Sequence, residues 1–156
     1  MIKIRKFNNN DIDFIVDNWL GTVRLDGVFQ NDTIEKIQKR ISFWQEEKNE
    51  KGDVSLGFCI ELDQKPIGIA WFTENIKGQL TYSLYIDVNF RGKGYGKQAS
   101  MMIEQILKDK GFKIIKSSCR QDNVASAILH EKLGFKLTKK ELSPNGTPMF
   151  RWEKEL

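Results

Sequence analysis

The chain has 156 residues, of which 40% are hydrophobic and 29% are charged. This composition predicts a single globular domain over residues 1–156 and excludes a disordered chain. The net charge is +4, but the 25 basic residues are interspersed among 21 acidic ones, which does not favour a nucleic acid as partner.

The first predicted elements are a strand and an amphipathic helix. Residues 2–7 alternate apolar and basic side chains with a period of two, which is typical of a half-buried strand. Apolar residues then recur at helical spacing over residues 12–20, after a cap at Asn10 or Asp11. Gly21 is predicted to end this helix.

A loop and a second helix are predicted next. Residues 22–31 have no clear periodicity and are expected to form the loop. Asp32 with Glu35 three residues later has the pattern of a capping box, and an apolar stripe follows it. That stripe consists of Ile34, Ile37, Ile41 and Trp44.

The middle of the chain changes to strand-like runs. Residues 54–62, 65–73 and 80–88 are rich in aromatic and β-branched side chains, and short polar segments separate them. This pattern predicts an antiparallel meander of three strands.

A third helix is predicted after residue 94 and ends at Gly111. Its apolar side chains share one face of a helix. They are Tyr95, Ala99, Met102, Ile103, Ile106 and Leu107.

The C-terminal part of the chain alternates strands with one more helix. Residues 112–119 read as a buried strand, and residues 124–133 read as a helix closed by a glycine. Residues 135–142 and 148–156 are expected to pair as strands around the turn SPNGT.

The sequence indicates neither a membrane protein nor a metal-binding protein. No apolar run is long enough to cross a bilayer and the N-terminus lacks a secretory signal, so we expect a cytoplasmic protein that makes no membrane contact. The one histidine, His130, forms no cluster with the two cysteines, so no metal site is predicted. Cys59 and Cys119 lie in strand-like stretches and are expected to be buried.

The segment RGKGYG carries the strongest functional signal. It joins the end of a predicted strand to the start of the third helix, where backbone N–H groups lack partners and the helix dipole is positive. Three glycines, Gly92, Gly94 and Gly96, let the backbone curl and approach a ligand closely. Arg91, Lys93 and Lys97 add positive charge, so a pyrophosphate fits best. The alternative is a glycine-rich turn that only starts a helix.

Two common nucleotide-binding motifs do not match this segment. A P-loop needs Ser or Thr after its Gly-Lys pair, but Gln98 follows Gly96 and Lys97. The dinucleotide fingerprint would need a glycine at position 97. Another kind of polyphosphate ligand is therefore indicated.

The segment resembles the acyl-CoA loop of the Gcn5-related N-acetyltransferase (GNAT) superfamily, whose pattern Arg/Gln-x-x-Gly-x-Gly/Ala is met by Arg91, Gly94 and Gly96. The resemblance continues in Asn123 and in the helix end HEKLGF, and it covers about residues 53–140. It implies an α+β (mixed α/β) fold with a central, mostly antiparallel mixed sheet of six to seven strands and about four helices.

The resemblance also implies acetyl-CoA as cosubstrate and a place for it. The pantetheine arm would lie beside Ile86, Asp87 and Val88, where the strand diverges from its parallel neighbour. Asn123 would bind the arm through its amide, or would simply cap a helix. The backbone of the turn would hold the pyrophosphate through Arg91, Gly92, Lys93, Gly94, Tyr95, Gly96 and Lys97.

Catalytic roles are carried over less completely. His130 stands where many relatives have a tyrosine that protonates the leaving thiolate, and it would also contact the cofactor; the alternative is a histidine on the flank of a buried helix face. The usual strand glutamate is missing from residues 80–82. Glu74 and Tyr82 are fallback candidates for the base, acting through water, and the alternatives are a solvated glutamate and a packed tyrosine.

The resemblance predicts an N-acetyltransferase that moves an acetyl group directly to a primary amine of a small molecule or an amino-acid-like acceptor. A homodimer is left open as its assembly. A protein N-terminal or lysine acetyltransferase and a non-catalytic acyl-CoA-binding module remain alternatives. Four aromatic residues could line an acceptor cleft, although strand alternation allows only one of each neighbouring pair to face it. They are Trp71, Phe72, Tyr82 and Tyr85.

Overall fold

The computed structural model describes residues 1–19, 33–76 and 78–156 of the chain. Seven strands form one sheet, with bounds β1 Ile2–Lys6, β2 Ser55–Leu62, β3 Lys65–Ile76, β4 Gln79–Ile86, β5 Ile114–Arg120, β6 Lys136–Leu142 and β7 Pro148–Glu155. Four α-helices lie in the same described ranges, namely α1 Ile12–Trp19, α2 Ile34–Glu46, α3 Tyr95–Asp109 and α4 Val124–Lys132. Two short 3-10 helices, η1 Asn9–Asp11 and η3 Val88–Phe90, precede α1 and follow β4.

The sheet is mixed and mostly antiparallel. Its strand order is β1-β2-β3-β4-β5-β7-β6. Among the described strands, β4 and β5 are the one pair of neighbours that runs parallel. The predicted sheet of six to seven strands with about four helices is therefore confirmed.

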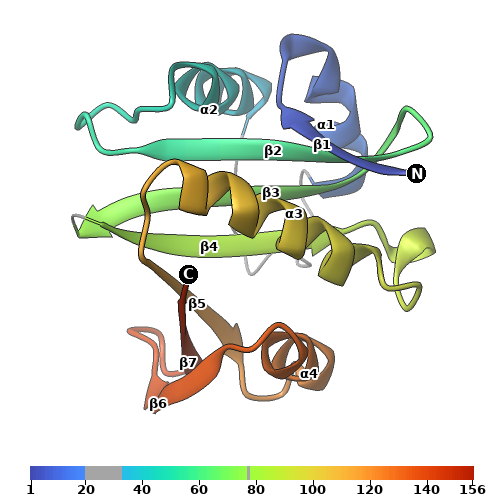
Figure 1. Ribbon diagram of the computed structural model, residues 1–156. Coiled ribbons are helices and arrows are strands. Elements are labelled where there is room, and N and C mark those ends of the chain that lie inside the picture. The colour runs from blue at the N-terminus through green and yellow to red at the C-terminus, as the bar shows by residue number, and fades with distance from the viewer. Residues whose placement is uncertain (20–32, 77) are drawn as a thin grey trace.

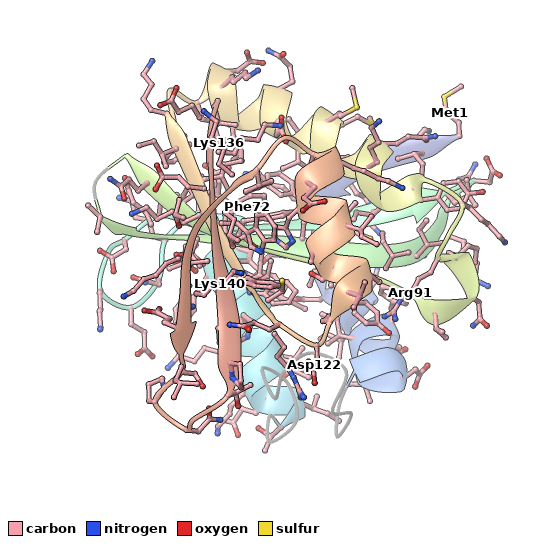
Figure 2. The ribbon with its side chains drawn as sticks, turned by 90° about the horizontal axis from the view of Figure 1, so that it is seen from below. Met1, Phe72, Arg91, Asp122, Lys136 and Lys140 are labelled. Atoms are coloured by element: carbon pink, nitrogen blue, oxygen red, sulfur yellow. The ribbon has the colours of Figure 1, made fainter. Side chains whose placement is uncertain are left out.

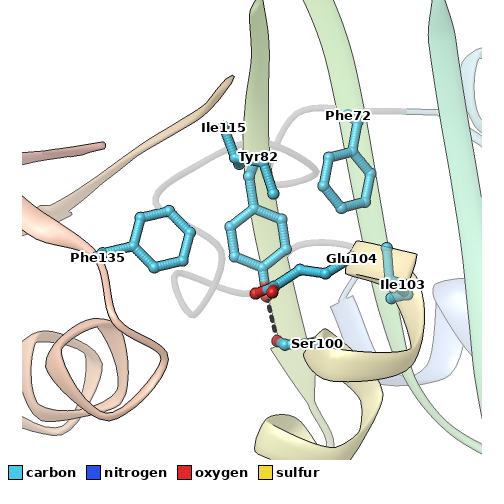
Figure 3. Close-up of a pocket in the computed structure, with 7 residues that line it drawn as sticks. All are labelled: Phe72, Tyr82, Ser100, Ile103, Glu104, Ile115 and Phe135. Carbon is cyan, nitrogen blue, oxygen red and sulfur yellow. Dashed lines mark hydrogen bonds between the residues drawn. The ribbon is translucent and has the colours of Figure 1, made fainter. Parts of the chain in front are cut away.

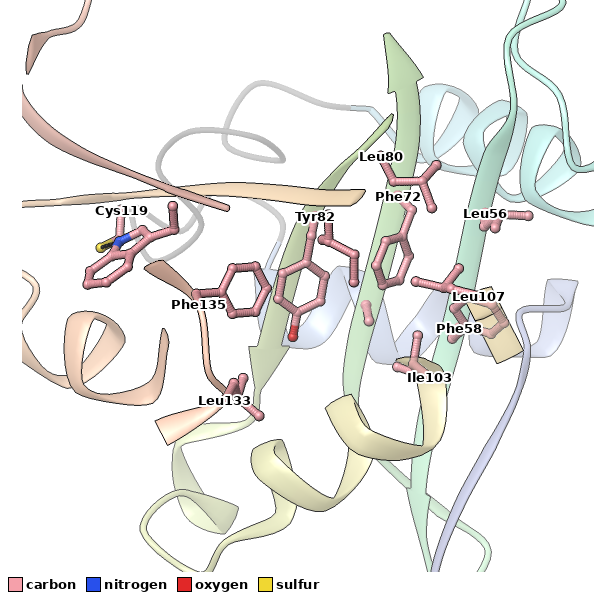
Figure 4. Packing of buried hydrophobic residues seen from close by; sticks show 13 residues of the cluster. Leu56, Phe58, Phe72, Leu80, Tyr82, Ile103, Leu107, Cys119, Leu133 and Phe135 are labelled. Carbon is pink, nitrogen blue, oxygen red and sulfur yellow. Dashed lines mark hydrogen bonds between the residues drawn. The ribbon is translucent and has the colours of Figure 1, made fainter. Parts of the chain in front are cut away.

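Helices cover both faces of this sheet (Figure 1). α1 and α2 lie against one face, and α3 crosses the opposite face. Leu133, just after α4, packs in the same buried cluster as Ile103 and Leu107 of α3, so α4 belongs to the α3 side. Figure 4 shows this cluster, in which the rings of Phe72, Tyr82 and Phe135 lie in a row.

Strand alternation divides the aromatic residues between the two faces. Phe72 and Tyr82 point toward α3 and join its cluster. Trp71 and Tyr85 instead pack with the cluster formed by α1 and α2. The expectation that neighbouring aromatic residues face opposite sides is confirmed.

The parallel pair β4–β5 is short. Its ladder contains only three residue pairs, and the last one joins Thr81 to Lys116. Beyond this pair β5 continues to pair with β7, and β4 continues to pair with β3. We call the region where the two strands stop pairing, residues 82–86 and 117–120, the β4–β5 divergence.

The helix starts differ from the prediction. The first helical segment is capped by Asn8 rather than by Asn10 or Asp11, because the Asn8 side chain accepts a hydrogen bond from the Asn10 N–H and the Asp11 carboxylate accepts one from the Asn8 N–H. α2 is capped by Thr33, whose Oγ1 accepts from the Lys36 N–H at 3.3 Å. The predicted cap Asp32, the helix end at 20–21 and the loop 22–31 lie outside the described residues.

Three other boundaries or packing assignments needed correction. β3 extends to Ile76 instead of ending near residue 73, so Glu74 lies within the strand and not at its end. β4 ends at Ile86 because the Asp87 side chain accepts from the Asn89 N–H and starts η3. Met102 is 42% exposed, because α3 turns Ser100, Ile103 and Leu107 toward the sheet instead.

Both cysteines are buried and unpaired with each other, as predicted. Burial raises the pKa of the Cys59 thiol to about 12, so this thiol stays protonated at neutral pH. The Trp152 indole N–H donates a hydrogen bond to Cys119 Sγ at 3.3 Å. Both side chains therefore serve packing.

Candidate active site

The RGKGYG turn has the backbone geometry of an anion site. Gly92 and Gly94 have φ angles of 74° and 82°, in the region that side chains with a Cβ rarely adopt. Gly94 is the N-cap of α3, and no side chain caps the helix there. The first N–H groups of a fifteen-residue helix thus lie at an exposed glycine, where they can bind an anion.

The basic side chains of the turn brace it. Arg91 Nε donates to the Ile86 carbonyl oxygen at 2.8 Å, and its guanidinium lies 5.0 Å from the centre of the Tyr85 ring. Lys93 Nζ lies 5.8 Å from the centre of the Phe90 ring. Figure 2 shows Arg91 at the edge of the molecule, beside η3. Arg91 therefore ties the turn to the end of β4.

The β4–β5 divergence extends from a polar contact, where the two strands stop pairing, to the glycine turn. Tyr82 is the first β4 residue after the last pair, and Ser117 is the first β5 residue after it. Ser117 Oγ lies 3.3 Å from the Tyr82 carbonyl oxygen, so these two groups meet where the strands separate. Ile86, at the other end of the divergence, is followed by Asp87 and Val88, which lead into the glycine turn.

Asn123 is the N-cap of α4. Its Oδ1 accepts a hydrogen bond from the Ser126 N–H at 3.1 Å. The helix-cap interpretation of Asn123 therefore holds for the oxygen of its side chain. Its Nδ2 group is a further donor that the cap does not use.

His130 is buried at the C-terminal end of α4, and its side chain is 6% exposed. Its ring stacks on Trp152, with centres 5.1 Å apart, and meets Phe135 edge-on at 5.2 Å. Nδ1 lies 2.7 Å from the Ser126 carbonyl oxygen, and Nε2 lies 2.8 Å from Ser117 Oγ. Burial lowers the pKa of His130 below its ordinary value of about 6.5, which favours a neutral ring.

Tyr82 contributes its backbone, not its hydroxyl, to the divergence. Its ring packs between Phe72 and Phe135, and its Oη shares a hydrogen bond of 2.8 Å with Ser100 Oγ (Figure 3). Burial raises the pKa of the Tyr82 phenol well above its ordinary value. These contacts favour the alternative of a packed tyrosine.

Glu74 lies near the turn of the β3–β4 hairpin, where its carboxylate has a hydrogen-bond partner. Its carboxylate accepts a hydrogen bond from the Gly78 N–H at 2.7 Å, and it pairs across the strands with Leu80. This contact favours a structural role in the β3–β4 turn.

An open groove lies on the face of the sheet covered by α2, and its volume is about 300 Å³. It combines basic, aromatic and small polar side chains, which are Lys36, Lys39, Arg40, Phe43, Trp44, Asn49, Ser55, Trp71 and Thr73. Thr73 pairs with Thr81 of β4, and Thr81 pairs with Lys116 of β5. The groove floor on β3 therefore lies about 10 Å, or two strand spacings, from β5.

The sequence prediction missed Ser117. It stands in the ordinary strand segment KSSCR and belongs to no motif. Side chains alternate along a strand, so Ser117 lies on the same face of β5 as the buried residues Ile115 and Cys119. This alternation is the only sequence signal that Ser117 faces α4 and His130.

The described parts of the chain contain neither a metal-ligand cluster nor a membrane-spanning helix. Within residues 1–19, 33–76 and 78–156, no three His, Cys, Asp or Glu side chains are grouped so that they could hold a metal ion. In the same ranges no helix is both long and apolar enough to span a membrane.

Comparison with known proteins identifies relatives. The chain is 27% identical over 97 residues to L-methionine sulfoximine/L-methionine sulfone acetyltransferases of Pseudomonas paraeruginosa and Pseudomonas aeruginosa. This match covers 62% of the chain and spans about half the length of these relatives, namely 52%.

Solved structures share the fold. PaiA N-acetyltransferase from Thermoplasma acidophilum, in complex with coenzyme A, superposes with a TM-score of 0.75 at 22% identity, covering 100% of this chain and 99% of that one. YncA, described as a putative acetyltransferase, from Salmonella typhimurium with acetyl-CoA gives 0.79 at 17% identity, covering 99% and 94%. The model of the acetyltransferase (GNAT) family matches residues 25–135. Since this match includes well over half of the chain and the RGKGYG turn, the protein belongs to the GNAT acetyltransferase family.

Proposed function

We propose that this protein transfers an acetyl group from acetyl-CoA to a primary amine of a small, amino-acid-like acceptor. The observation that carries the proposal is the β4–β5 divergence, which opens beside a glycine turn at an uncapped helix start. A diverging strand edge suits the amide groups of a pantetheine arm, and the helix start suits its pyrophosphate.

The cofactor is assigned to named parts of the chain. The backbone N–H groups of residues 91–97 hold the pyrophosphate, and Lys97, which is exposed, adds charge nearby. The pantetheine arm lies beside Ile86, Asp87 and Val88, with Asn123 Nδ2 as a donor on the α4 side. The thioester then reaches the inner end of the divergence, next to His130 and its partner Ser117.

Acetyl transfer needs an oxyanion donor and a path for one proton. A backbone N–H of β4 within the divergence, between Tyr82 and Ile86, is proposed to donate to the oxyanion as the amine attacks the carbonyl carbon. The C–N bond forms, the C–S bond breaks, and the proton that leaves the amine ends on the thiolate. A direct transfer therefore needs no further reactant.

The groove under α2 supports a small acceptor with an acidic group. Its volume suits a molecule of amino-acid size, and Lys36 and Arg40 at its wall favour a carboxylate over a polycation. The charge of Lys39 is already paired with Glu50. The aromatic members, among them Trp71 and Phe43, suit an apolar side chain. The curated relatives that act on methionine sulfoximine and sulfone point to the same class of acceptor.

The cofactor assignment is tested by thermal unfolding with added acetyl-CoA. A ligand that binds only the folded state at 100 times its dissociation constant stabilises it by about 2.7 kcal/mol, which raises the melting temperature by several degrees. ATP is the control because it offers phosphates without a pantetheine arm. No shift with acetyl-CoA, or an equal shift with ATP, would contradict the assignment.

A further inference from the structure

Ser117 has a position from which it can take part in the acetyl transfer, if the function proposed above holds. Ser117 occupies the inner end of the β4–β5 divergence, one residue beyond the last β4–β5 pair. Its Oγ is within hydrogen-bond distance of two groups, the Tyr82 carbonyl oxygen at 3.3 Å and His130 Nε2 at 2.8 Å. The hydroxyl therefore links the buried imidazole to the place proposed for the thioester.

The hydrogen bonds fix which ring nitrogen carries the proton. The Ser126 carbonyl can only accept, so Nδ1 of His130 must donate to it at 2.7 Å. In the neutral ring Nε2 is then an acceptor, and the Ser117 O–H donates to it. If the ring gains a proton, Nε2–H donates to Ser117 Oγ, and the hydroxyl hydrogen turns to the Tyr82 side, toward the divergence. The direction of the Ser117 hydroxyl thus follows the charge of His130.

The ring cannot reach the divergence by itself. His130 is held between Trp152 and Phe135 and uses both nitrogens within the protein. Ser117, although only 7% exposed, is the polar atom that stands between the ring and the β4 edge. A direct contact of His130 with the sulfur would have to displace this hydroxyl.

We propose that the Ser117 hydroxyl, backed by His130, exchanges the proton of the reaction with the substrates. As the attacking amine loses its proton to Ser117 Oγ, the hydroxyl proton moves to Nε2 of His130. When the C–S bond breaks, Nε2–H returns a proton to Oγ and the hydroxyl gives one to the thiolate. The amine nitrogen loses one proton and the CoA sulfur gains one, so Ser117 and His130 return to their starting protonation states. Ser117 is then a catalytic residue, and His130 acts through it.

The surroundings of the ring agree with this role. Because its pKa is lowered, the His130 ring is neutral before the reaction and can accept a proton. Once protonated, the ring gives that proton up readily. The titratable groups packed in this region are Cys119 of β5, Tyr82 of β4 and the ion pair between Glu104 of α3 and Lys154 of β7. In that pair the two charges compensate each other, at 2.8 Å.

Ser117→Ala tests the proposal, with Ser42→Ala as the matched control. Ser42 is an exposed residue of α2 and lies outside the β4–β5 divergence. We expect Ser117→Ala to lower kcat by about tenfold or more with the best amine substrate, while KM for acetyl-CoA changes by less than about threefold. Ser42→Ala should retain the parent values. Ser117→Thr, which keeps the hydroxyl, should recover most of the rate.

A second readout needs no acceptor. When the thiol of bound CoA passes its proton through Ser117 to His130, Nε2–H donates to Ser117 Oγ and the hydroxyl donates to the thiolate. The thiol of the complex, followed by its ultraviolet absorbance, should therefore titrate about one pH unit lower in the parent protein than in Ser117→Ala. A purely structural serine would not move this titration. If the parent protein binds no CoA, both the proposed function and the relay fail. If it binds CoA, equal thiol titrations, or an equal kcat for Ser117→Ala and the parent, overturn the relay alone.

Discussion

Replacing His130 by alanine is expected to lower the free energy of unfolding by about 3 kcal/mol at neutral pH. The ring is packed between Trp152 and Phe135, so its removal leaves a cavity in the core. The hydroxyl of Ser117 also loses its shortest hydrogen-bond partner. Urea denaturation measures the loss, and Glu131→Ala, an exposed position on the same helix, should cost far less.

The stability difference between the parent protein and His130→Ala should depend on pH in a definite direction. The pKa of His130 is lower in the folded protein than its value of about 6.5 in the unfolded chain, so below pH 6.5 the unfolded chain binds more protons. The contribution of the neutral ring is therefore complete above about pH 6.5 and is lost as the pH falls through the folded-state pKa. We expect the stability difference between the parent and His130→Ala to narrow in acid. A difference that stays constant or widens would contradict a buried, neutral His130.

The second large effect is expected for Gly94→Val, which should weaken CoA binding by about 100-fold or more. A side chain at this N-cap with φ near 82° forces the turn out of its shape, and it also blocks the approach of the pyrophosphate to the helix start. Titration calorimetry with CoA measures the change.

Gly146→Val is the control that separates strain from binding. Gly146 has a φ of 83°, and, like Gly94, its added Cβ would meet no atom within 4 Å. It lies between β6 and β7, far along the chain from the proposed cofactor site. Both variants should lose a similar stability, about 2 kcal/mol, but only Gly94→Val should lose CoA affinity. Equal affinities in the two variants would refute the role of the turn.

Local patterns were sufficient to predict the framework of the fold. Strand alternation placed Trp71 and Phe72 on opposite faces, and the meander of β2, β3 and β4 follows from runs separated by short turns. The glycine turn was predictable because its backbone geometry requires residues without a Cβ, and glycines can be recognised directly in the sequence.

Contacts between distant segments were not predictable in the same way. The Asn8 cap competes with two neighbours, Asn10 and Asp11, that fit the same local rule, and only the packed structure selects one. His130 could be placed on α4 from its spacing, but its partner Ser117 comes from another element and has no motif. Whether a polar residue on a strand meets a histidine on a helix depends on tertiary packing.

The measurement that tests the central claim most directly is acetyl transfer by the unmodified protein. Acetyl-CoA is mixed with separate amines, namely L-methionine sulfone, a polyamine, an aminoglycoside and a peptide with a free N-terminus, and thiol release is followed together with the mass of each amine. The proposed function predicts that thiol release depends on the protein and matches the acetylated amine formed, with the amino acid analogue preferred over the polycations. Binding of acetyl-CoA without transfer to any of these amines would contradict it and would favour an acyl-CoA-binding module.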